Sequence, residues 1–254
     1  MKTGNKFCSI IMTHFAADEV RSSVLRKSIT SLIKNTKYPY ELVVIDNGGS
    51  VTDSQFLLAL SDKGEISTYV KNSHNMHFAY ARNQGLELAQ GDYISIVDND
   101  LEYKSGWLTE CVHILEEFPQ KKWYATPLDY PTPVMKKRYT MELIRHGGEK
   151  YILSMRAGSN CFVMRREDFK KIGKFLIHRI SGSKWTDKAV RSGYLAVVVP
   201  GNLVRDIGLR MGYNLAENLP VYLDVKHDEK IYFNRDEFLD DKPELVHQLP
   251  KSFS

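Results

Sequence analysis

The side chains of this chain best suited to chemistry are three polar residues that follow a short apolar run. Residues 93–97 are predicted to form a buried strand, and Asp98, Asn99 and Asp100 come directly after it. Side chains at i and i+2 of an extended backbone point the same way, so Asp98 and Asp100 can approach one ligand together. If that ligand is a polyanion, a cation must lie between it and the two carboxylates. Mg²⁺ or Mn²⁺, bound by carboxylates and phosphates together, can take that position. Taken alone, the three residues fit a solvated turn better, because Asp and Asn favour turns.

Length and composition are those of an ordinary globular protein. The 254 residues suit one α/β domain with room for an appendage; 43% are apolar, 26% are charged, and the formal net charge is +4. Basic and acidic residues are interleaved, which argues against a dedicated nucleic-acid binder. The chain has an odd number of cysteines, three, which are widely spaced and lie in apolar stretches: Cys8, Cys111 and Cys161. This is typical of buried free thiols in a reducing compartment.

The first residues predict where the protein resides. Residues 1–6 are polar, and the apolar run after them is too short for a signal peptide core or a membrane span. Together with free thiols, this predicts a cytoplasmic protein. Any membrane contact would be peripheral, through a lipid-linked ligand or a partner. A basic stretch, Lys136-Lys137-Arg138 with Arg145, is a weak candidate for peripheral contact, because such stretches are usually solvated loops.

Strand and helix patterns alternate along the first hundred residues. Thr52 with Gln55 suits a capping box at the start of the second helix, and Gly91 is expected to stop the third. This alternation predicts an α/β fold with a doubly wound, mostly parallel sheet. The predicted strands are 7–12, 41–45, 66–70 and 93–97, and the predicted helices are 18–35, 52–60 and 78–89.

Polar residues follow three of these strands. Thr13 and His14 begin the loop expected after the first, Asp46 follows the second, and the acidic stretch follows the fourth. Ligands of such sheets bind at the carboxyl ends of the strands. The convergence of these residues at one edge favours a binding site over a surface turn.

The pattern loosens after Asp100. Residues 127–150 are predicted to be a loop region with a short hairpin or helix near 139–144. The other predicted elements are helices at 107–118, 166–172 and 236–241 and strands at 122–126, 161–164 and 195–199.

Four stretches follow one another along the chain: ELVVIDNG (41–48), FAYARNQG (78–85), GDY (91–93) leading into Asp98–Asp100, and GSNCFVMRR (158–166). This series resembles family 2 glycosyltransferases over about residues 7–208. The resemblance implies a GT-A fold, a Rossmann-like fold that binds nucleotide sugars. It divides the chain into a catalytic domain (1–210) and a C-terminal extension (211–254), with a donor half of about 1–100 and an acceptor half of about 101–210.

The resemblance also implies roles for individual residues. Asp46 matches the acid that recognises the base, and its carboxylate would accept the imide N–H of uracil. Asp100 matches the metal ligand and Asp98 would contact ribose or a metal-bound water. The residues implied to bind the nucleotide are Thr13, His14, Asp46, Arg82, Asp98 and Asn99.

Two later segments bear on the same centre. Where the family commonly has a histidine metal ligand two residues before a glycine, this chain has Asp206 before Gly208; a carboxylate is a competent ligand for Mn²⁺ or Mg²⁺. The family's catalytic base matches Asp187, the only acid in residues 185–194. A second departure is His77, where the family usually has glycine.

The sequence therefore predicts a metal-dependent, inverting glycosyltransferase of the kind used in polysaccharide biosynthesis. Its donor would be a nucleotide-diphosphate sugar, with UDP as the family default and GDP or dTDP open, and its acceptor a hydroxyl of a glycan or lipid-linked glycan. One alternative is a non-catalytic carbohydrate- or nucleotide-sugar-binding protein of the same fold. Another is a sugar-nucleotide pyrophosphorylase, but the residues after the first strand (THFAA, 13–17) lack its glycine-rich basic loop.

Overall fold

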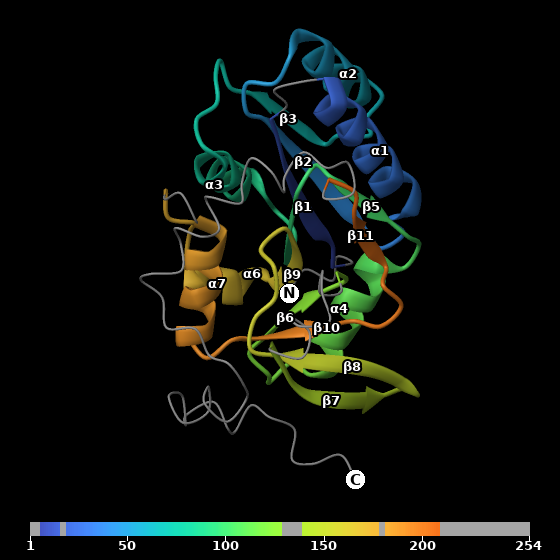
Figure 1. Cartoon of the computed structure of the whole chain (residues 1–254), viewed down its shortest axis with the longest axis vertical. Helices are drawn as coiled ribbons and strands as arrows, with labels where there is room; N and C mark the ends of the chain where they lie inside the picture. Colours follow the sequence, from blue (N-terminus) through green and yellow to red (C-terminus); the bar gives the residue numbers. More distant parts are fainter. Residues whose placement is uncertain (1–5, 16–18, 129–138, 178–180, 209–254) are drawn as a thin grey trace.

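Figure 1 shows the computed structural model, which describes residues 6–15, 19–128, 139–177 and 181–208. Its helices are α1 (Glu19–Asn35), α2 (Val51–Asp62), α3 (Phe78–Leu88), α4 (Trp107–Glu117), α6 (Arg166–Ile172) and α7 (Ser181–Arg191). Its strands are β1 (Cys8–His14), β2 (Tyr40–Asp46), β3 (Thr68–Lys71), β4 (Tyr93–Val97), β5 (Leu101–Tyr103), β6 (Trp123–Thr126), β7 (Thr140–His146), β8 (Glu149–Ser154), β9 (Cys161–Arg165), β10 (Leu195–Val198) and β11 (Val204–Asp206).

A central sheet has the strand order β3-β2-β1-β4-β9-β6-β10-β8-β7. The first four strands are mutually parallel, so their carboxyl ends meet at one edge. β9 lies antiparallel between β4 and β6, β10 pairs parallel with β6, and the β7–β8 hairpin forms an antiparallel edge. The predicted α/β fold is confirmed, with its main parallel block formed by β1 to β4.

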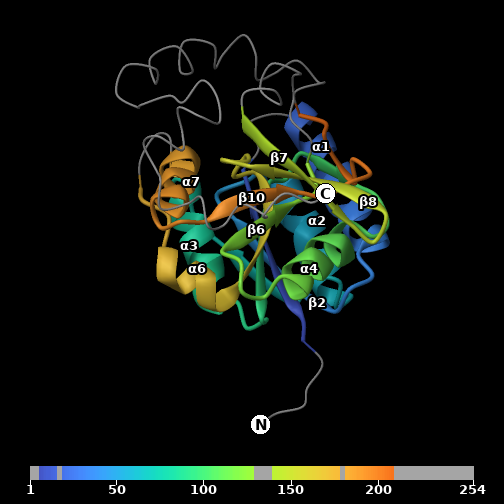
Figure 2. The same cartoon turned by 90° about the horizontal axis from the view of Figure 1, so that it is seen from below.

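Helices cover both faces of the sheet, with α1, α2 and α4 on one side and α3, α6 and α7 on the other (Figure 2). Neighbouring residues of β1 serve opposite faces: Ile10 and Met12 join the α1/α4 core, and Ile11 joins the α3/α7 core. A sheet buried on both faces explains why its central strands are continuous apolar runs. The three cysteines are free and buried, as predicted.

A two-stranded sheet, unforeseen in the sequence, lies beside the central one. β5 follows the acidic turn directly, and β11 pairs with it antiparallel, placing Asp206 opposite Leu101. This pairing brings residues about a hundred positions apart to the same place.

Several local predictions are wrong, each for a visible reason. Thr13 and His14 belong to β1 rather than to a loop, since they pair with Ile45 and Asp46. The cap of α2 is Ser50, whose side chain accepts from the backbone N–H of Asp53, so there is no capping box starting at Thr52. Gly91 does not cap α3: the helix ends at Leu88, and a Cβ on Gly91 would lie 2.6 Å from the backbone nitrogen of Ser9.

The described residues after Asp100 contain more regular secondary structure than the sequence predicted. The hairpin alternative near 139–144 is correct, but it extends through β7 and β8 to Ser154. The basic residues 136–138, the helix at 236–241 and the extension 211–254 lie outside the described residues. The helices in the described part of the chain are too short or too polar to span a bilayer.

Candidate active site

The acidic turn lies between β4 and β5, at the edge where the parallel strands end. The backbone N–H groups of Ile207 and Gly208 donate to the carbonyl oxygen of Asp100, at 2.9 and 3.3 Å. Gly208 has to be small, since a Cβ there would lie 2.2 Å from Asp100 Oδ2. The structure thus brings Asp98, Asp100 and Asp206 to one centre, as their proposed shared role requires.

The electrostatics of this centre favour a cation. Burial in the first place, and then the negative charges of Asp98 and Asp206, together raise the pKa of Asp100 from 3.8 to about 8. Oxygen donors of this kind suit Mg²⁺ or Mn²⁺. The three acids are more open than a closed metal site: within the described residues, they are not among the groups whose ligand atoms all lie within 4.8 Å of one another. They fit a metal that also takes ligands from a substrate.

Arg82 of α3 is the buried cation of the site. Its Nη2 lies 2.5 Å from Asp98 Oδ1, and its guanidinium lies over the rings of Phe78 and Phe175, 5.0 and 5.2 Å from their centroids. The Nε and Nη1 groups of Arg82 are buried and have no hydrogen-bond partner in the described part of the chain. Buried unpaired donors are costly. They are well suited to the oxygens of an anionic ligand such as a diphosphate.

His14 connects the acidic turn to the rest of the fold. Its Nδ1 lies 2.8 Å from the amide nitrogen of Asn99, and its Nε2 lies 3.3 Å from Asp53 Oδ2. With the Asn99 amide as donor, Nδ1 accepts and the proton sits on Nε2, facing Asp53. Burial lowers the pKa of His14, although the nearby Asp46 and Asp53 oppose this. The ring is buried, so the structure shows His14 positioning Asn99 rather than exposed to a nucleoside.

Asp53 is the residue of this group that sequence reasoning missed. It is buried in α2 and accepts from the hydroxyl of Ser22 at 2.7 Å and from Arg26 Nη2 at 3.3 Å. The pattern Ser50-x-x-Asp53 was available as a helix start. Nothing in the sequence indicated contact with the first strand.

Asp46 is also buried and already has three donors. Its oxygens accept from the backbone of Gly49 at 2.8 Å, the hydroxyl of Ser54 at 2.5 Å and the hydroxyl of Tyr69 at 2.9 Å. Base recognition by Asp46 therefore requires one donor to give way, and it stays a prediction. Thr13 lies one residue before His14 in β1 and is half-buried.

Asp187, the predicted base, lies in the second turn of α7 and not at its start. Arg156, which follows β8, holds its carboxylate through an ion pair of 3.1 Å. Two residues earlier, Trp185 is buried, and its ring stacks on Phe162 with centroids 4.7 Å apart. This anchor fixes the rotation of α7, so Asp187 stays on the half-exposed face.

The amino end of α7 lies close to Arg82. A Cβ on Gly182 would lie 2.0 Å from the hydroxyl of Ser159 and 3.8 Å from Arg82 Nη1. Arg82 in turn bonds Asp98. The helix that carries Asp187 therefore begins beside the guanidinium that contacts the acidic turn.

Residues 9–173, well over half of the chain, match the sequence profile of glycosyl transferase family 2. The chain belongs to glycosyl transferase family 2. Its fold is the GT-A fold, which solved glycosyltransferase structures share. A mannosyltransferase from Pyrobaculum calidifontis in complex with GDP-Man and Mn²⁺ superposes with a TM-score of 0.69 at 17% identity, covering 97% of this chain and 69% of the other. GalNAc-T7 with UDP, GalNAc and Mn²⁺ superposes with a TM-score of 0.62 at 17% identity, covering 99% and 53%.

Curated relatives share shorter segments. A glucosyl-dolichyl phosphate glucuronosyltransferase of Haloferax volcanii is 26% identical over 113 residues, 44% of this chain and 34% of that protein. A hyaluronan synthase of Pasteurella multocida is 30% identical over 110 residues, 43% of this chain and 11% of that protein. The chain thus spans about a third or less of the length of these two relatives.

The structure explains two positions at which this chain departs from the pattern of glycosyl transferase family 2. His77 has a φ of +74°, the left-handed region that favours glycine. Its Nδ1 accepts from the backbone N–H of Ala79 at 3.2 Å, so the side chain caps α3. Asp206 occupies the histidine position and contributes to the negative field at Asp100.

Proposed function

We propose that this family 2 protein transfers a sugar from a nucleotide-diphosphate donor, a UDP-sugar in the first instance, to a hydroxyl of a glycan or lipid-linked glycan, with inversion. The observation that carries the proposal is the pairing of an acidic centre with a buried, partly unpaired guanidinium. A nucleoside diphosphate held through a divalent cation would satisfy both, because the metal neutralises the acids and the phosphates accept from Arg82.

Asp100, with Asp98 and Asp206, would hold the cation, Mn²⁺ or Mg²⁺. The bound metal would supply positive charge at the diphosphate as the sugar is transferred. The free Nε and Nη1 hydrogens of Arg82 would bind diphosphate oxygens, and its bond to Asp98 keeps the guanidinium in place. His14 and Asn99 would hold the acidic turn in register with the nucleotide.

Asp187 would act as the general base. Its carboxylate would take the proton from the acceptor hydroxyl as that oxygen attacks the anomeric carbon. Attack from the face opposite the nucleotide would break the bond between the anomeric carbon and the diphosphate oxygen, release the nucleoside diphosphate and invert the configuration. Arg156 would orient the carboxylate, and Trp185 would hold α7 so that the base keeps its distance from the donor.

Relatives and neighbours support this class of donor and metal. The two solved neighbours named above were each determined with Mn²⁺, one with GDP-Man and the other with UDP and GalNAc. A relative from Haloferax volcanii is named for transfer to a glucosyl-dolichyl phosphate, which is consistent with a lipid-linked acceptor. A cytoplasmic protein that meets such an acceptor at the membrane surface remains our proposal for its location.

The test is a panel of UDP-, GDP- and dTDP-sugars incubated with the purified chain and Mn²⁺, Mg²⁺ or EDTA. The proposal expects slow hydrolysis of one donor class that requires the metal. Pyrophosphate-dependent exchange would instead identify a pyrophosphorylase. Binding of a sugar nucleotide without turnover, even with a library of acceptors, would identify a non-catalytic binder.

Asp100→Ala provides the matched variant. It should abolish turnover and weaken metal-dependent nucleotide binding while the far-ultraviolet circular dichroism stays unchanged. Asp62→Ala makes the same substitution at an exposed acid at the end of α2 and should behave as the parent. Full activity of Asp100→Ala, or equal UDP affinity with and without Mn²⁺ in the parent, would contradict the proposed site.

A further inference from the structure

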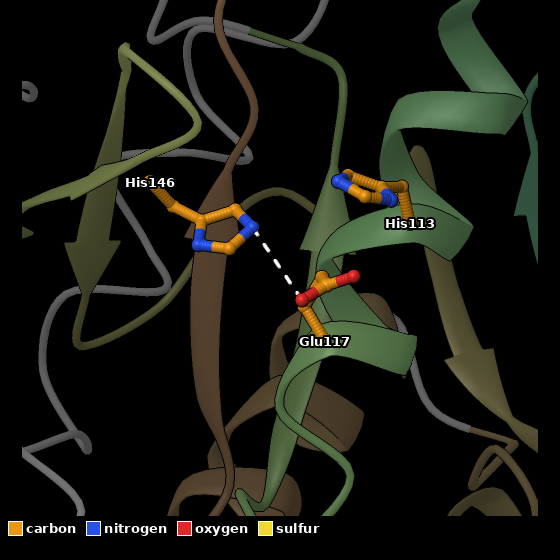
Figure 3. A group of neighbouring side chains, drawn as sticks. All are labelled: His113, Glu117 and His146. Atoms are coloured by element: carbon orange, nitrogen blue, oxygen red, sulfur yellow. Dashed lines mark ion pairs between the residues drawn. The ribbon is translucent and has the colours of Figure 1, made fainter.

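A second group of ligating side chains lies away from the acidic centre. His113 and Glu117 belong to α4, and His146 is the last residue of β7 (Figure 3). In Figure 3 the two α4 side chains project from the same side of the helix toward the strand that carries His146. The three residues come from two elements, and 28 positions, residues 118–145, separate Glu117 from His146 in the sequence.

The geometry of the group is that of a metal site. Residues i and i+4 lie on the same face of a helix, one turn apart, as His113 and Glu117 do. One ligand atom from each of the three side chains lies within 4.8 Å of the other two. His146 Nε2 is 3.6 Å from Glu117 Oε2, and the two imidazole centroids are 5.8 Å apart.

The backbone and neighbours hold His146 in place. It precedes Gly147 and Gly148, which both have positive φ and form the two-residue turn of the β7–β8 hairpin. The ring of Phe118 meets that of His146 edge-on, with centroids 5.4 Å apart. A ligand held by a tight turn and an aromatic contact loses little freedom when it binds an ion.

This group is separate from the acidic centre. Glu116, next to Glu117, bonds Lys6 before β1 and the hydroxyl of Tyr93, the first residue of β4. The carboxyl end of α4 therefore lies at the amino ends of β1 and β4, whereas Asp98 and Asp100 follow the carboxyl end of β4. A metal here would not be the one that meets the donor.

We propose that His113, Glu117 and His146 form a zinc site that fastens the β7–β8 hairpin to α4. Two imidazoles and one carboxylate are a borderline-soft donor set that suits Zn²⁺ and disfavours Mg²⁺, the reverse of the all-oxygen acidic centre. Three protein ligands leave a fourth tetrahedral position for water. An open fourth position is more usual in catalytic zinc sites, so the structural role is assigned from position: the group joins an edge hairpin to a helix, away from the acidic centre.

The test uses the full chain with any histidine tag removed and the protein treated with chelator. Zn²⁺ is titrated by calorimetry, and Co²⁺ is used as a visible probe of tetrahedral coordination. We expect one site that binds Zn²⁺ far more tightly than Mg²⁺ and raises Tm. Loss of an outer-shell partner weakens metal binding by about 10- to 100-fold, so His113→Ala and His146→Ala, which remove a ligand, should each weaken Zn²⁺ binding by at least that factor. Glu117→Gln should weaken Zn²⁺ binding too.

Controls separate this site from other sources of zinc affinity. His74→Ala removes an exposed histidine outside the group and should leave Zn²⁺ binding unchanged. Asp100→Ala should also leave it unchanged, since the acidic centre is elsewhere. Circular dichroism of each variant without metal verifies folding. Equal Zn²⁺ affinity in the parent, His113→Ala and His146→Ala, or no Zn²⁺ binding in the parent, would overturn the proposal.

Discussion

Replacing Asp100 by Asn should stabilise the metal-free protein, although it destroys the metal centre. Burial and the charges of Asp98 and Asp206 raise the pKa of Asp100 from 3.8 to about 8. At pH 7 the unfolded chain has this carboxylate ionised and the folded protein has it protonated, so folding must take up a proton. At about 1.4 kcal/mol per pKa unit, this limits the penalty to about 4 kcal/mol. Asp100 is partly exposed, and solvent screening reduces the expected value to about 1–3 kcal/mol.

The sign of the effect gives the pH window. A raised folded-state pKa contributes stability that is present below about pH 4 and is lost as the pH rises toward 8. The advantage of Asp100→Asn should therefore be negligible near pH 4 and grow up to pH 8. Thermal unfolding in EDTA measures it, at about 2–4 °C of Tm per kcal/mol for a chain of this size.

Adding Mn²⁺ should reverse the order of stability. The parent gains stability by binding the ion, and Asp100→Asn gains little. Asp62→Asn is the control for the same substitution at an exposed acid. If Asp100→Asn is less stable than the parent in EDTA at pH 8, or if Mn²⁺ stabilises both proteins equally, the electrostatic reasoning fails.

Three further outcomes follow from the geometry of the site. Arg82→Lys keeps the charge but loses the planar fork, so donor affinity should fall by about 1.5–3 kcal/mol, measured by calorimetry with UDP and Mn²⁺; unchanged affinity would argue against a phosphate contact. Asp187→Asn should cut turnover by roughly two orders of magnitude or more with donor binding unchanged, and a product that retains the donor's configuration would contradict its role as base. Asp46→Ala should weaken donor affinity more than turnover, because base recognition is uniform binding; a loss confined to turnover, compared by steady-state kinetics, would exclude that role.

Local patterns in the sequence were enough for the first half of the fold. Buried central strands appear as short apolar runs, and helices appear as periodic stripes, because each element's burial is repeated along its own residues. The strand at 93–97 was predicted at its observed bounds, and the acids after it were expected at the edge of the sheet where they lie. The series of motifs gave the family, which the profile match confirms.

Tertiary structure alone decided how the site is assembled. The pairing of β11 with β5 brings Asp206 to Asp100, and this contact has no local signature because it joins residues about a hundred positions apart. The burial of His14 between Asn99 and Asp53 depends on three elements meeting, so a histidine expected in a loop became a buried support. In the same way, only the folded chain shows that Arg82 has buried N–H groups without a partner among the described residues and that Arg156 forms an ion pair with Asp187. A sequence specifies which side chains are available at strand ends, whereas packing determines which of them face a ligand and which support the others.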